Sequence, residues 1–176
     1  MNVRGVTACL LAVAATVAGC AIGPTGVIDG GEPAVGFQPS VRLYFVSGAR
    51  LRAVSRPGPL PSLKETLNLL VDGPSTAERR QGLSTDLSPE EGTPDQVTAD
   101  AARVRISLAV PPVARPRPSP EPRVPPLWLG QLTCTAANAL AARANIDPDA
   151  VTVVIRRGEA QRFGSFRCSE FPRAQE

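Results

Sequence analysis

The segment SLKETLNLLVDGPSTAERRQGLSTDL, residues 62–87, decides how the rest of this chain can fold. It opens with a capping box, because Ser62 and Glu65 have the spacing at which each side chain bonds the backbone amide of the other residue. Leucines then recur at helical spacing on one face, which predicts an amphipathic helix. Each buried leucine stabilises the fold by roughly 1.5–3 kcal/mol, so this helix is expected to form a main wall of the core.

The end of this helix is encoded as clearly as its start. Gly73 supplies a left-handed residue and Pro74 prevents continuation of the helix. A second capping box, Ser75 to Glu78, predicts a short polar turn that ends at Gly82.

Periodicity predicts the other elements. Alternating apolar residues indicate a β-hairpin and two later strands, and an apolar face with Leu129, Leu132, Ala136, Ala139 and Leu140 indicates a second helix. The expected strands are 41–46, 51–56, 103–108 and 150–156, with a weaker one at 96–99, and the expected helix is 127–144. In the first strand, the side chains of Val41, Leu43 and Phe45 are expected to face the core, with Arg42 and Tyr44 on the opposite face.

A helix that ends in Leu-x-x-Gly-Pro, then a short turn and Gly-Leu-x-Thr, resembles the GerMN domain, a sporulation and spore-germination module also found in actinobacterial envelope lipoproteins. The hairpin and the helix segment LGQLTCTAANAL extend this resemblance over about residues 41–160. The matching motif residues are Gly73, Pro74, Gly82, Leu83 and Thr85. We therefore expect one α+β domain over residues 41–171, with an antiparallel or mixed sheet packed against two helices in the order β-β-α-β-β-α-β-β, and a tail at 172–176.

The N-terminus predicts export and lipidation. Residues 1–19 have a short apolar run after Arg4, as in a signal peptide, and Val-Ala-Gly-Cys20 matches the lipobox of bacterial lipoproteins. Cleavage before Cys20 would leave a thiol to carry diacylglycerol, and further acylation, such as palmitate, would anchor the chain durably. An ordinary secretory signal and an uncleaved membrane anchor are the alternatives. Residues 20–40 are expected to be the lipidated cysteine and a flexible tether that reaches roughly 25 Å, so the domain would lie at the outer face of the cytoplasmic membrane.

Two cysteines remain within the domain, Cys134 and Cys168. An exported domain with two such thiols most often forms one disulfide, and we expect it here. The proline-rich insertion 111–126 is either an exposed spacer or a docking segment for a proline-binding groove.

Composition excludes several function classes. The chain has no histidine, which removes Ser-His-Asp and Cys-His catalysis. Its net charge of +3 comes without a basic stretch interleaved with aromatics, which argues against nucleic acid as a partner.

The acidic candidate residues are interpreted as structural. Asp72, Asp86 and Asp95 have structural explanations at a helix end and in loops, and Glu90, Glu91 and Asp95 are interpreted as solvated loop charge rather than a cation site. Trp128 is interpreted as a staple against the core rather than a ligand platform.

The sequence thus favours a non-enzymatic envelope lipoprotein, held to the membrane through Cys20, whose GerMN-like domain binds or assembles with another envelope protein. A binder of cell-wall glycan or of a small ligand, with a site near Tyr44 or Trp128, is the alternative. No cofactor or metal is expected, and the resemblance leaves a role in sporulation open.

Overall fold

The computed structural model describes residues 39–88, 92–110, 125–159 and 161–174, and every described element belongs to one compact unit. Its class is α+β. In chain order the elements are β1 (Ser40–Ser47), β2 (Arg50–Pro57), α1 (Leu63–Val71), α2 (Thr76–Arg80), β3 (Pro94–Asp100), β4 (Arg103–Leu108), α4 (Leu127–Ala144), β5 (Thr152–Arg157) and β6 (Gln161–Phe166), with 3-10 turns η1 (Pro148–Ala150) and η2 (Cys168–Glu170).

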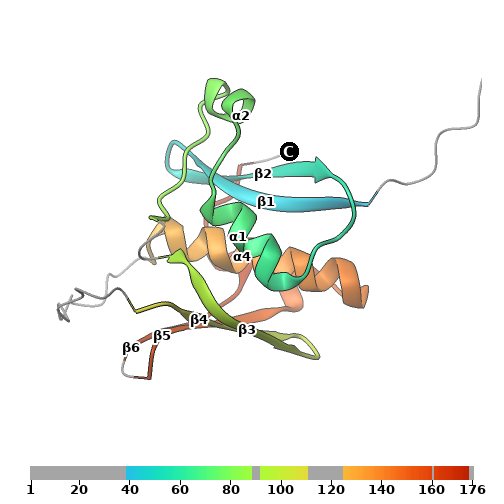
Figure 1. Cartoon of the computed structure of the whole chain (residues 1–176), viewed down its shortest axis with the longest axis vertical. Coiled ribbons are helices and arrows are strands. Elements are labelled where there is room, and N and C mark those ends of the chain that lie inside the picture. The colour runs from blue at the N-terminus through green and yellow to red at the C-terminus, as the bar shows by residue number, and fades with distance from the viewer. Residues whose placement is uncertain (1–38, 89–91, 111–124, 160, 175–176) are drawn as a thin grey trace, which may run out of the picture. The chain divides into compact units, whose positions relative to one another are not determined.

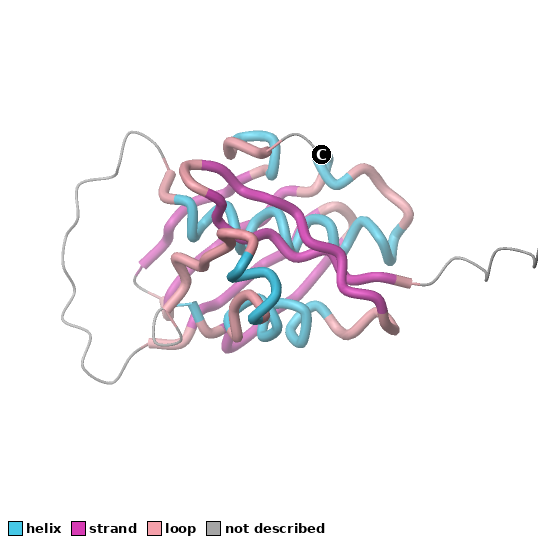
Figure 2. The backbone as a smooth tube through the Cα atoms, turned by 90° about the horizontal axis from the view of Figure 1, so that it is seen from above, coloured by secondary structure: helices cyan, strands magenta, loops and turns pink. Residues whose placement is uncertain are grey.

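The strands form two sheets rather than the single sheet that the sequence suggested. β1 and β2 form an antiparallel hairpin, and β3-β4-β5-β6 form a four-stranded sheet in which only the β4–β5 pair is parallel. Helices α1 and α4 lie between the hairpin and the four-stranded sheet (Figure 1). Figure 2, viewed from the hairpin side, shows the hairpin lying across the helices, with strands of the other sheet behind them.

Helix α4 is the reason for this division. It is buried on nearly all sides, and twelve of its residues have little or no exposed surface, including the polar Gln131, Thr133 and Thr135. A helix that is covered all round must have partners on two sides. Here one side packs on β1 and the other on the inner face of the four-stranded sheet, where Val104, Ile106, Val153 and Ile155 are fully buried.

Most predicted boundaries are confirmed. α4 has the bounds expected for it, α1 begins after Ser62 with the predicted capping box, and Gly73 takes a positive φ of 83° directly after the helix. After Gly158 the chain forms β6, the final strand of the expected order, and the 3-10 turn η2. The lipidation residue Cys20, the tether and residues 111–124 of the proline-rich insertion lie outside the described residues.

Tyr44 contradicts its predicted exposure. The strand alternation placed it on the solvent face, yet it is only 5% exposed. Helix α4 lies along the outer edge of β1, and Asn138 Nδ2 donates to the Tyr44 hydroxyl at 3.1 Å. The apolar/polar alternation of β1 predicts only one buried face, whereas at Tyr44 the opposite face is covered as well.

The C-terminal segment connects the two sheets. After β6 and η2 the chain runs back to the hairpin, where the Leu51 amide donates to Pro172 O and the Ala174 amide donates to Leu51 O, each at 2.8 Å. Since β6 belongs to the four-stranded sheet and Leu51 to β2, residues 167–174 span the helical layer between them.

Candidate functional site

The Gly-Pro motif forms a rigid turn around α2. Ser75 and Glu78 make the predicted capping box, and α2 ends in a Schellman arrangement, with the Leu83 amide bonded to Glu78 O and the Gly82 amide to Arg79 O. Gly82 has a φ of 81°, which favours glycine at this position. Gly73, Pro74 and Leu83 are buried, whereas Gly82 is exposed.

An ion pair fixes this turn to the hairpin. Arg56 on β2 donates from Nε and Nη2 to the two carboxylate oxygens of Glu78, at 3.1 and 2.7 Å, and also from Nη2 to Gly73 O at 3.1 Å. The hydrogen bonds from Arg56, assisted by the Ser75 amide, hold the pKa of Glu78 below its ordinary value in spite of burial. One arginine therefore holds both the start of the motif, at Gly73, and helix α2, through Glu78, and Glu78 has a structural role.

Thr85, the last motif residue, belongs to a buried polar cluster with α4. Gln131, which is fully buried, donates from Nε2 to Tyr44 O at 3.1 Å and to Thr85 Oγ1 at 3.3 Å, and its Oε1 accepts from the Asp86 amide at 2.9 Å. Thr135 Oγ1 accepts from the Tyr44 amide at 3.1 Å. The side chains of α4 thus bond an edge of β1 in the way that a neighbouring strand would.

These contacts assign the five motif residues to architecture. Gly73, Pro74, Gly82 and Leu83 shape the α2 turn, and Thr85 joins it to α4. Sequence reasoning missed Arg56, Gln131 and Thr135, which carry most of the polar bonds in this region. The sequence signal that could have identified this cluster is the row of polar residues Gln131, Thr135 and Asn138 at helical spacing. Such a row is typical of a solvent-facing side of a helix, but in this structure it faces β1.

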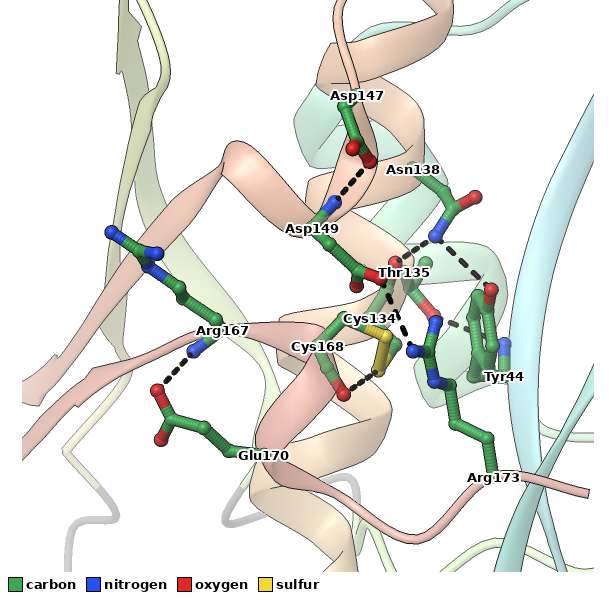
Figure 3. Close-up of a disulfide and its surroundings, with 10 residues drawn as sticks. All are labelled: Tyr44, Cys134, Thr135, Asn138, Asp147, Asp149, Arg167, Cys168, Glu170 and Arg173. Carbon is green, nitrogen blue, oxygen red and sulfur yellow. Dashed lines mark hydrogen bonds and ion pairs between the residues drawn. A yellow bond between two sulfur atoms is a disulfide. The ribbon is translucent and has the colours of Figure 1, made fainter.

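The predicted disulfide is present and lies at the centre of Figure 3. Cys134 on α4 and Cys168 in η2 are both fully buried, with Cα atoms 4.6 Å apart. Around the bond, Arg173 pairs with Asp149 at 3.2 Å, and Glu170 accepts from the Arg167 amide at 3.1 Å. The disulfide therefore holds the connecting segment 167–174 to the central helix.

The other candidate residues do not gather into a reactive site. Asp72, Asp86 and Asp95 are each exposed on separate elements or loops, while Glu90 and Glu91 lie outside the described residues. Within the described part of the chain, no three acidic or cysteine side chains are placed to hold a metal ion. Trp128 is half-buried and packs edge-on against Phe163 of β6, with ring centres 5.0 Å apart, which supports its interpretation as a staple.

A shallow groove lies beside the beginning of β1. It has a volume of about 320 Å³, and its walls come from both strands of the hairpin, α1, the segment before α1 and the last turns of α4. The lining residues are Ser40, Val41, Arg42, Ser55, Leu60, Thr66, Asn138, Ala139, Ala142 and Arg143. Leu60 is 40% exposed here, one of the exposed large apolar side chains of the described chain. Apolar walls with two arginines suit a short, partly apolar segment that carries a carboxylate or backbone carbonyls.

Comparison of the chain with protein-family models, with curated proteins and with solved structures gives no match in any of the three. The GerMN resemblance therefore stays a prediction that rests on the quoted motif. None of the helices in the described part of the chain combines the length and the apolar character needed to cross a membrane.

Proposed function

We propose that this protein is a lipoprotein anchored through Cys20 at the outer face of the cytoplasmic membrane, and that its α+β domain binds another envelope protein without catalysing a reaction. The groove between β1, α1 and α4 is the observation that carries the binding proposal. It offers apolar contact at the exposed Leu60 and Ala142, and two guanidinium groups close by, in a fold whose motif residues are otherwise used for architecture.

The disulfide supports the proposed location. Such bonds form and persist outside the reducing cytosol, and this one joins the segment 167–174 to α4. The lipobox supplies the means of anchoring.

Crosslinking in cells tests the proposal, followed by mass spectrometry of the proteins that co-purify from membranes. Ala142→Glu places a carboxylate in the groove, and Ala144→Glu is its matched control, because Ala144 is exposed on the same helix but does not line the groove. We expect one dominant partner with the native chain and with Ala144→Glu, and its loss with Ala142→Glu. Cys20→Ala should release the chain from membranes.

A partner that is retained by both variants would refute the groove as the binding site. Recovery of wall fragments in place of a protein would refute the protein-binding function and favour the glycan-binding alternative.

A further inference from the structure

The outer face of the four-stranded sheet is strongly cationic. Strand alternation places Val104, Ile106, Val153 and Ile155 against the helices, so their neighbours project from the opposite face. The strand register aligns that face in three rows: Asp100, Arg103 and Thr152; then Thr98, Arg105, Val154 and Ser165; then Gln96, Ser107, Arg156 and Arg162. All four arginines are exposed, and Asp100 is the one carboxylate in these rows.

No described element covers this face. Both α1 and α4 lie on the other side of the sheet, and the hairpin lies beyond them (Figure 1). The ion pairs that the structure shows between described residues join Arg56 to Glu78 and Arg173 to Asp149, so they leave the arginines of the face available.

The chemistry of the face selects among anionic partners. Its rows contain no aromatic side chain, although single-stranded nucleic acids are held on sheets by stacking their bases on aromatics. The exposed large apolar residues of the described chain, Leu60 and Val110, lie elsewhere, so the face lacks the apolar anchors on which protein interfaces depend. A broad polar surface with spaced guanidinium groups suits phosphate headgroups.

We propose that this face, formed by Arg103, Arg105, Arg156 and Arg162, docks on a bilayer surface that contains anionic phospholipid. The inference rests on the proposed function, because the lipid anchor at Cys20 is what would hold this face near a bilayer. Each arginine near an anionic surface contributes roughly 1 kcal/mol, which is weak alone but becomes effective when a tether raises the local concentration of the domain. Docking in this orientation turns α2 and the hairpin away from the membrane (Figure 1).

Vesicle binding tests this directly. A chain that begins at Ala21 keeps every described element, since the compact unit begins at Phe37. It is mixed with vesicles of 30 mol% phosphatidylglycerol in phosphatidylcholine, or of phosphatidylcholine alone, at low and high salt, and the bound fraction is measured by sedimentation. We expect binding to the anionic vesicles only, with loss of binding at high salt.

Two triple variants with equal charge change separate the face from net charge. Arg105→Gln/Arg156→Gln/Arg162→Gln should weaken partitioning by roughly 100-fold, to the level of neutral vesicles. Arg50→Gln/Arg52→Gln/Arg80→Gln removes three exposed arginines from the hairpin and from α2, and should retain most of the binding. Circular dichroism melting confirms that both variants are folded.

Equal loss in the two variants, or no preference for anionic vesicles, would overturn the proposal. Preferential binding to inorganic polyphosphate that displaces the chain from vesicles would also overturn the choice of lipid. The assay needs neither lipidation nor a protein partner, so its outcome is independent of the crosslinking result.

Discussion

Replacement of Gln131 by methionine tests whether α4 truly serves as a bonding partner for β1. Methionine has nearly the same length but cannot hydrogen-bond the three groups that Gln131 contacts, Tyr44 O, Thr85 Oγ1 and the Asp86 amide. Leaving a buried polar group unpaired costs about 1–3 kcal/mol. With Tyr44 O and the Asp86 amide both orphaned, and with some compensation from burying an apolar chain, we expect a loss of about 3 kcal/mol in the free energy of unfolding.

Thr133→Val is the matched control. Thr133 is also fully buried on α4, but its hydroxyl has no hydrogen-bond partner among the described residues. Valine removes a buried polar group of similar shape, so stability should stay equal or rise by up to about 1 kcal/mol. Urea unfolding of both variants at neutral pH with the disulfide intact measures the two changes. A Gln131→Met variant within 0.5 kcal/mol of the native chain, or a Thr133→Val variant as unstable as Gln131→Met, would refute the proposed role of α4.

Three further predictions concern the disulfide and the α2 turn. Cys134→Ala/Cys168→Ala opens a loop with a sequence separation of 34, and should lower unfolding stability by about 3.8 kcal/mol, measured by urea titration; an unchanged midpoint would contradict it. The folded-state pKa of Glu78 lies below its unfolded value, so the Arg56 pair stabilises fully above the unfolded pKa and its contribution is lost as pH falls through the folded pKa. The stability difference between the native chain and Glu78→Gln should accordingly be constant above about pH 5 and shrink in acid, as followed by urea unfolding over pH 3–7; a pH-independent difference would argue against the ion pair. Gly82→Ala should cost about 1–2 kcal/mol through its positive φ alone, because a Cβ at this position meets no atom within 4 Å, and thermal unfolding against Ala77→Gly in the same turn checks this.

The sequence was most informative where signals are local. Capping at Ser62 and Ser75, the glycines that end both helices, and the alternation of Val104 and Ile106 depend on neighbouring residues only, and these elements appear where they were predicted. The division into two sheets depends instead on long-range packing, because the hairpin and the four-stranded sheet contact opposite sides of α4. Periodicity gives the faces of one element at a time, so it could not show that the polar row at Gln131 and Thr135 lies against Tyr44.

The same limit applies to the candidate sites. The disulfide followed from counting thiols in a chain predicted to be exported, without knowledge of the fold. The groove and the cationic face could not be anticipated, because each combines residues from strands or helices that are distant in sequence. Arg105 and Arg162, for example, lie in separate strands, and only the register of the strands between them places both on one surface.

Hydrogen bonds at the outer edges of β1 and β2 affect how copies of this protein can interact when they are close together. An unpaired strand edge is a template onto which a second molecule can add its own strand. On β1, Val46 exchanges two amide bonds with Ser84, and Tyr44 is bonded by α4; on β2, Leu51 is bonded by the C-terminal segment. A protein confined to a membrane surface, as we propose for this one, meets its own copies at high local density. The outer edges of the hairpin are thus protected near its turn, at Tyr44, Val46 and Leu51, against the addition of a strand from a neighbouring copy.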